Sequence, residues 1–240
     1  MKRLIIILLL VGTTSVARPQ AGAPAKPAPK AATGTAAKPA TAPAHPTAVI
    51  ETTAGKLTCE LFPDKAPIGV ANFIGLSRGT RDWTSPTTHK LKHGVPLYDG
   101  TIFHRVIPQF MIQGGDPAGT GEGDGGYKFK NETSPDLLFD RPGRLAYANA
   151  GPDTNGSQFF VTEVPYPSLN GGYTIFGQCD DASVELVKQI AGMGRDGNDR
   201  PFRPVKIVHI TITGTGPARV PANTPMKRPV ASTQKPANPN

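Results

Sequence analysis

One arginine stands close to several large apolar residues in the segment FHRVIPQFMIQGGD, residues 103–116. Arg105 is followed by Phe110, Met111 and Gln113, and no serine or cysteine in the segment could act as a nucleophile. A guanidinium stays charged at all relevant pH values and offers five N–H donors. These residues favour hydrogen-bond donation from a fixed charge over nucleophilic chemistry.

Other sites for chemistry are less well supported. His89 and His93 have the spacing of two ligands on a helix, but they lie between Pro86 and Gly94 without a third ligand, so we expect no metal. The glycine-rich run at 119–127 lacks the flanking strand, helix and lysine of a phosphate loop, so we expect no nucleotide to bind there. No serine lies in a hydrolase elbow, and Ser157 is interpreted as a turn residue.

Short runs of alternating apolar and polar residues, separated by glycine-rich turns, must form the elements that position Arg105. They predict about eight strands, at residues 48–53, 55–62, 98–107, 109–113, 143–149, 158–162, 173–178 and 205–213. Helical spacing predicts two helices, over 66–79 and 180–192. Many short strands with few helices indicate a barrel or a sandwich.

Alternation along the strand at 98–107 assigns its side chains to two faces. Phe103, Arg105 and Ile107 should share one face, and His104 and Val106 the other. His104 is interpreted as a core histidine whose hydrogen bonds are satisfied. Asn149, Gln158 and Phe160 are polar and aromatic companions expected near Arg105.

Three blocks resemble the signature segments of the cyclophilins, which are peptidyl-prolyl cis–trans isomerases: residues 103–116, ANAGPDTNGSQFFVT at 148–162 and LNGGYTIFG at 169–177. The resemblance runs from about Val49 to Thr213 and implies an all-β fold, a closed eight-stranded antiparallel barrel capped by two α-helices. It implies that the catalytic residues are Arg105, Phe110 and Gln113, and that substrate is bound by Met111, Gly119, Ala148, Asn149, Gln158, Phe160, Leu169 and Tyr173.

Two positions depart from the best-known members of that family. Ser168 stands where many have a tryptophan that grips cyclosporin-type ligands, and Tyr173 where many have a histidine. The segment from Thr80 to Pro96 is also longer than in compact members. Sensitivity to such ligands stays open at Ser168, while we expect an aromatic wall retained at Tyr173 and a surface loop that could shape access.

The implied reaction is rotation about an X–Pro bond, which needs neither nucleophile nor cofactor. In our hypothesis Arg105 donates to the prolyl nitrogen or the adjoining carbonyl while the apolar residues hold the ring. An alternative is a binding module that grips proline-containing segments without turnover as its main task. The presence of Arg105, Phe110, Met111 and Gln113 together favours the isomerase.

Both ends of the chain differ in composition from its middle. Residues 1–17 have the basic start, apolar run and small residues of a signal peptide, and 18–47 and 214–240 are predicted to be disordered. The middle, residues 48–213, holds 16 basic and 18 acidic residues, which disfavours nucleic acid as a partner. We expect a periplasmic or secreted monomer, free of the membrane after cleavage, that acts on proline-containing peptides and unfolded exported proteins.

Cys59 and Cys179 are the two cysteines of the chain. In an oxidising compartment they could form a disulfide, but 120 residues separate them. Two small apolar residues inside strands are the slightly preferred interpretation, and the pairing stays open.

Overall fold

The computed structural model describes residues 45–214. The predicted signal peptide, residues 18–44 of the predicted linker and residues 215–240 of the predicted tail lie outside the described residues. Residues 45–47 belong to the fold rather than to a linker, because Leu61 N donates to Pro46 O at 2.8 Å and Thr47 pairs with Thr213. No helix among residues 45–214 is both long and apolar enough to cross a membrane.

The main sheet has eight strands, as expected, and most lie within two residues of the predicted bounds. They are β1 Thr47–Thr52, β2 Gly55–Leu61, β5 Arg105–Ile107, β6 Met111–Gly114, β7 Arg144–Tyr147, β8 Phe159–Thr162, β9 Ile175–Cys179 and β10 Ile207–Thr213. A separate pair, β3 Trp83–Thr84 and β4 Leu91–Lys92, lies in the Thr80 to Pro96 segment. Trp83 fixes this loop, because its ring is buried in the core and its Nε1 donates to Val95 O at 2.9 Å.

Both predicted helices are present. Helix α1, Pro67–Arg78, begins with proline, and Glu132 from a distant loop accepts from Ile68 N and Gly69 N at 2.9 and 2.7 Å. Helix α2, Asp181–Ala191, is capped by Asp180, which accepts from Ser183 N at 2.8 Å. These carboxylates satisfy N–H groups that have no partner within the helix.

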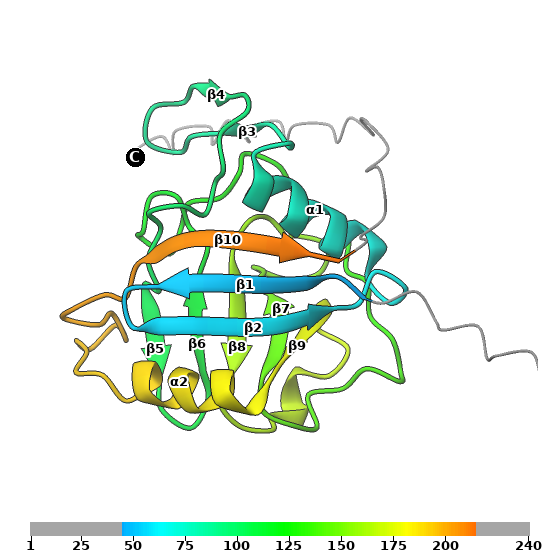
Figure 1. The fold of residues 1–240 in the computed structure, drawn as a ribbon, viewed down its shortest axis with the longest axis vertical. Helices are drawn as coiled ribbons and strands as arrows, with labels where there is room; N and C mark the ends of the chain where they lie inside the picture. Colours follow the sequence, from blue (N-terminus) through cyan, green and yellow to red (C-terminus); the bar gives the residue numbers. More distant parts are fainter. Residues whose placement is uncertain (1–44, 215–240) are drawn as a thin grey trace, which may run out of the picture. The chain divides into compact units, whose positions relative to one another are not determined.

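The sheet is antiparallel in every pairing and runs in the order β10-β1-β2-β9-β7-β8-β6-β5. It curls so that β10, β1 and β2 lie in front of β5, β6, β8 and β7 (Figure 1). The barrel is open between β10 and β5, so the prediction of a closed barrel is wrong. The irregular segment before β5 occupies this gap, where Phe103 N donates to Val205 O and Ile102 makes single bridges to Asp116 and Lys206.

The two faces of the curled sheet have separate apolar clusters. The inner cluster contains fully buried Val106, Ile112, Phe159 and Val161. The outer cluster includes Met111 and Phe160, which alternate with those residues along β6 and β8. Because successive side chains of a strand point to opposite faces, the same strands build both the core and an outer apolar surface.

Cys59 and Cys179 form a disulfide between β2 and β9, where they are directly paired residues. Both are buried, Cys59 inside β2 and Cys179 at the end of β9, so the preferred interpretation was right about their burial and wrong about their bonding. The sequence could not show this because the pairing depends on the order of strands in the sheet.

Candidate active site

Strand register brings Arg105 beside two of its predicted companions. Arg105 in β5 pairs with Gln113 in β6, which pairs with Phe160 in β8, and Phe160 pairs with Ala146 in β7. Directly opposite residues of neighbouring strands carry side chains on the same face. A row from a charged donor to an aromatic ring therefore crosses the outer face of the sheet.

A loop after α2 holds the Arg105 side chain. Arg105 Nε lies 3.6 Å from Asp199 Oδ2, and Arg195 Nε donates to Asp199 Oδ1 at 3.2 Å. The backbone fixes the same loop, because Val106 N donates to Asp199 O at 2.9 Å. With its Nε beside a carboxylate, the guanidinium keeps its two terminal nitrogens for a substrate.

Gln113 and Gln158 form a polar ridge beside Arg105. Gln113 Nε2 donates to Gln158 Oε1 at 2.8 Å, and Gln158 Nε2 donates to Gly121 O and Gly123 O, each at 2.8 Å. These bonds tie the row on the sheet to the glycine-rich loop. The orientation of Gln113 therefore depends on the position of that loop.

The glycine-rich loop is wrapped around the buried carboxylate of Asp116. Asp116 accepts from the backbone N–H groups of Ala118, Thr120, Gly121 and Gly123 at 2.7 to 3.2 Å. Burial raises the pKa of Asp116, but these donors outweigh it and hold the pKa below its ordinary value. The amides that a phosphate loop would offer to a ligand are thus directed at a carboxylate of the chain itself.

The predicted pocket residues lie in the outer apolar cluster. Buried Met111 and Phe160 are joined there by partly buried Phe110, Ala148, Leu169 and Tyr173, and also by Phe139, Ala146, Ile175, Ile107 and Leu137. Tyr173 meets Phe160 edge-on with ring centroids 5.6 Å apart, so the aromatic wall expected at this position is present.

The remaining predicted residues lie at the borders of the row. Asn149 Nδ2 donates to Gly172 O at 3.0 Å, and Ala148 N donates to Gln158 O at 3.0 Å. Gly119 has a φ of 67° and accepts from Arg200 Nη1 at 2.6 Å. Ser168 is exposed in the short 3-10 helix Pro167–Leu169.

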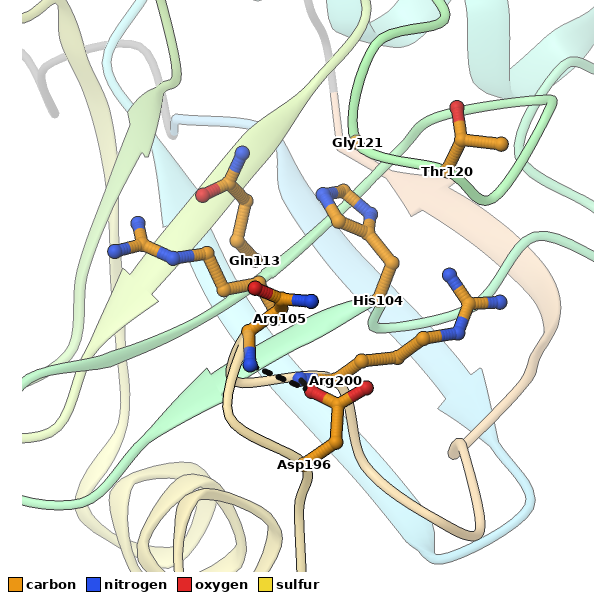
Figure 2. Close-up of a pocket in the computed structure, with 8 residues that line it drawn as sticks. His104, Arg105, Gln113, Thr120, Gly121, Asp196 and Arg200 are labelled. Atoms are coloured by element: carbon orange, nitrogen blue, oxygen red, sulfur yellow. Dashed lines mark hydrogen bonds between the residues drawn. The ribbon is translucent and has the colours of Figure 1, made fainter.

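Two cavities adjoin the row. The first, of about 310 Å³, is bordered by Arg105, Gln113 and Arg200 (Figure 2). The second, of about 290 Å³, is bordered by Gln113, Gln158 and Asn149. Gln113 and Gly121 line both, so the polar ridge separates two hollows beside the arginine.

The predictions for Phe103 and His104 need correction. Strand β5 begins only at Arg105, and without a continuous ladder before it Phe103 enters the inner core instead of sharing the Arg105 face. His104 is 5% exposed, but neither ring nitrogen has a hydrogen-bond partner among residues 45–214, so it is buried without being satisfied.

Three contributors to the site were not anticipated. Asp199 lies in the stretch DGNDR, residues 196–200, whose sequence is typical of a turn. Tyr166 stacks on Phe110 with ring centroids 4.4 Å apart, and buried Glu163 accepts from Gln109 N at 2.7 Å in the turn before Phe110. Sequence patterns could not reveal these three residues, because each contacts the site from a segment that is distant in the sequence.

Among residues 45–214, no three His, Cys, Asp or Glu side chains gather as a candidate metal site.

Comparisons with known proteins agree with this geometry. Residues 47–212 match the family described as "Cyclophilin type peptidyl-prolyl cis-trans isomerase/CLD". The chain is 52% identical over 168 residues to peptidyl-prolyl cis-trans isomerase A of Mycobacterium tuberculosis, covering 70% of this chain and 92% of that protein. It is 47% identical over 167 residues to isomerase B of Streptomyces anulatus, covering 69% and 95%.

A solved structure gives the same result. The crystal structure of a cyclophilin type peptidyl-prolyl cis-trans isomerase from Cryptosporidium parvum is 36% identical, with a TM-score of 0.61, covering 71% of this chain and 99% of that one. The same protein was also solved in the presence of the dipeptide Ala-Pro, with a TM-score of 0.60 and coverage of 70% and 99%. Because the family match, the similar relatives and the solved structure all agree, this chain belongs to the cyclophilin-type peptidyl-prolyl cis–trans isomerases.

Proposed function

We propose that Arg105 is the hydrogen-bond donor that catalyses X–Pro rotation in this protein. The observation that carries the proposal is the row Arg105–Gln113–Phe160, which ends in the outer apolar cluster. The proline ring lies against Met111 and Phe160, and a terminal nitrogen of Arg105 donates to the prolyl nitrogen or to the adjoining carbonyl. The donated bond competes for the lone pair that gives the amide its double-bond character.

The energetic demand is within reach of such a site. The barrier to amide rotation is about 18–20 kcal/mol. A gain of about 10⁵ in rate requires about 7 kcal/mol of transition-state preference. One preorganised charged donor supplies about 3–4 kcal/mol, and desolvation and orientation of the bound peptide supply the remainder.

The border residues hold one side of the rotating bond. Asn149, Gln158, Ala148 and Gly119 contact the peptide backbone, so that only the other side turns. Support for a proline-containing substrate comes from the Cryptosporidium parvum relative, which was crystallised with Ala-Pro. Proline-containing peptides and unfolded chains are accordingly the substrates of this protein.

The test is the cis-to-trans rate of a short X–Pro peptide with the full chain and with Arg105→Ala. We expect kcat/KM to fall about 10²- to 10³-fold in Arg105→Ala, the effect of removing one preorganised donor. Arg105→Lys keeps the charge without the planar fork and should fall between the two. Arg203→Ala, an exposed arginine outside both cavities, is the matched control and should retain the rate.

Two outcomes would contradict the proposal. If Arg105→Ala isomerises the peptide as fast as the intact chain, Arg105 is not the donor. If the intact chain binds proline peptides without accelerating exchange, the protein is a binding module. Circular dichroism of each variant separates these outcomes from loss of fold.

We also propose that the protein is exported and acts as a monomer on exported proteins. The signal-like residues 1–17 and the disulfide between Cys59 and Cys179 support export, since disulfides persist in oxidising compartments. Fusing residues 1–47 to a reporter enzyme that is active only outside the cytoplasm tests it. Activity should be lost when Leu8 and Leu9 are replaced by arginine, and retention of activity would contradict export through this segment.

A further inference from the structure

The cavity of about 310 Å³ lies beside Arg105 and is not used by the proline ring in the mechanism above. Figure 2 shows the guanidinium groups of Arg105 and Arg200 on opposite flanks of the cavity, with the ring of His104 between them. The outer apolar cluster contains none of these three side chains. The cavity is therefore a polar hollow next to the reaction centre.

His104 supplies an observation that points to a ligand. The residue is only 5% exposed, yet neither ring nitrogen has a partner among residues 45–214. Buried polar atoms are nearly always hydrogen-bonded, and one that is not calls for an explanation. Because His104 lines the cavity, a group entering there could complete its hydrogen bonding.

Arg200 has donors available for such a group. Its Nη1 donates to Gly119 O at 2.6 Å, and the described residues give its other side-chain nitrogens no further hydrogen bond. A guanidinium carries five N–H donors, so four remain for a ligand. A carboxylate is the partner whose geometry and charge match these donors best.

The cavity lining holds two arginines, Arg105 and Arg200, against one acidic residue, Asp196. Asp196 Oδ1 accepts from Asn198 N at 2.8 Å and from Arg200 N at 3.0 Å. Asp199 lies between Arg105 and Arg195. The cavity therefore presents unused cationic donors although residues 48–213 together hold more acidic than basic residues.

We infer that this cavity is a subsite for an acidic side chain of the substrate close to the X–Pro bond, with Arg200 and His104 as its hydrogen-bond donors. This inference rests on the proposed isomerase function and adds a substrate preference to it. The carboxylate of an aspartate or glutamate enters between Arg200 and His104, and the proline ring occupies the apolar cluster on the other side of Arg105.

The experiment compares pairs of proline peptides with the full chain. Each pair differs only by glutamate or glutamine at one position, either of the two residues before proline or either of the two after it. We expect kcat/KM to favour glutamate at one position by about two- to fivefold, the effect of one partly exposed ion pair. In Arg200→Gln the ratio should fall to about one, and Arg200→Lys should retain part of it.

Arg203→Gln is the matched control, because it removes an equal charge from the same part of the chain at an exposed residue that does not line the cavity. Its glutamate preference should equal that of the intact chain. A ratio near one at all four positions in the intact chain, or an unchanged ratio in Arg200→Gln, would overturn the subsite. Failure to isomerise the glutamine peptides at all would instead overturn the proposed function, so the two failures are distinguishable.

Discussion

Arg105 reaches the outer face of the sheet on a strand of only three residues, so its side chain needs support from outside that strand. Asp199 provides it from a loop that is bonded to the next residue of β5, through Val106 N and Asp199 O. A partly exposed ion pair contributes little to stability. At a catalytic donor it has another effect, because it restricts the positions that the terminal nitrogens can occupy.

Tyr166 carries the first prediction at this scale. Its ring lies 4.4 Å from that of Phe110, and it stands two residues before exposed Ser168. Removing the ring in Tyr166→Ala takes away one side of the packing that holds Phe110 at the apolar cluster. Since an aromatic pair contributes about 0.5–1.5 kcal/mol, we expect KM for a proline peptide to rise about two- to tenfold with kcat nearly unchanged.

Steady-state isomerisation kinetics measure both constants. Tyr166→Phe keeps the ring and should behave like the intact chain, whereas Ser168→Ala should change neither constant. If Tyr166→Ala lowers kcat and leaves KM unaltered, Tyr166 does not act through substrate binding and the interpretation fails.

At the scale of elements, the glycine-rich loop depends on Asp116. Gly115, just before Asp116, lies against the backbone at Ser157, and an added Cβ would approach Ser157 O to 2.6 Å at a φ of 82°. This close approach needs glycine, and beyond it the loop carbonyls of Gly121 and Gly123 accept from Gln158 Nε2. A carboxylate that collects backbone N–H groups thus sets the position of the polar ridge beside Arg105.

Asp116→Asn tests this dependence. The amide turns an NH₂ group toward donors that need an acceptor, and hydrogen bonds to charged groups contribute about 1.5–3 kcal/mol each. We expect the free energy of unfolding at pH 7 to fall by about 2–3 kcal/mol. Urea unfolding monitored by circular dichroism measures it.

The difference in unfolding free energy between the intact chain and Asp116→Asn should depend on pH. The pKa of Asp116 is lower in the folded chain than its ordinary value, so its stabilisation is complete above the ordinary carboxyl pKa. That stabilisation is lost as pH falls through the lower, folded pKa. The stability difference between the intact chain and Asp116→Asn should therefore shrink at acidic pH, and a difference that is constant or grows would contradict the role of Asp116.

Regular elements were predictable because their signals are local. Helical spacing marked α1, and alternation marked β1 and β2. The segment before β5 was not predictable, because Ile102 and Phe103 pair with segments distant in the sequence instead of continuing a ladder. Residues that support the site from other elements, such as Asp199, give no signal near Arg105 in the sequence.

For the described part of the molecule as a whole, one curled sheet serves two purposes. Its inner face forms the main core, and its outer face carries the candidate active site on β5, β6 and β8. The edges of the sheet, β10 and β5, do not pair with each other, and the irregular segment near Ile102 lies between them. Stability of the fold therefore depends on links between segments that are distant in the sequence.

The disulfide between Cys59 and Cys179 is such a link, and it spans 120 residues. By restricting the unfolded chain, a cross-link that closes so long a loop is expected to contribute about 3–5 kcal/mol. For a domain of this size that corresponds to a fall in Tm of about 10 °C on its loss. The active-site row lies on other strands, so kcat/KM at 25 °C should stay within about twofold of the oxidised protein.

Reduction of the intact chain with dithiothreitol tests this without changing side-chain volume, and the double variant Cys59→Ala/Cys179→Ala checks it without reductant. Thermal unfolding and peptide isomerisation are measured on the same samples, with dithiothreitol added to the double variant as the control for the reagent. Because the bond joins β2 to β9 and the reaction centre lies on β5, β6 and β8, stability and activity should separate. An equal Tm in the oxidised and reduced forms would show that pairing of the strands alone holds β2 against β9, and a parallel loss of activity would show that the outer face depends on this link.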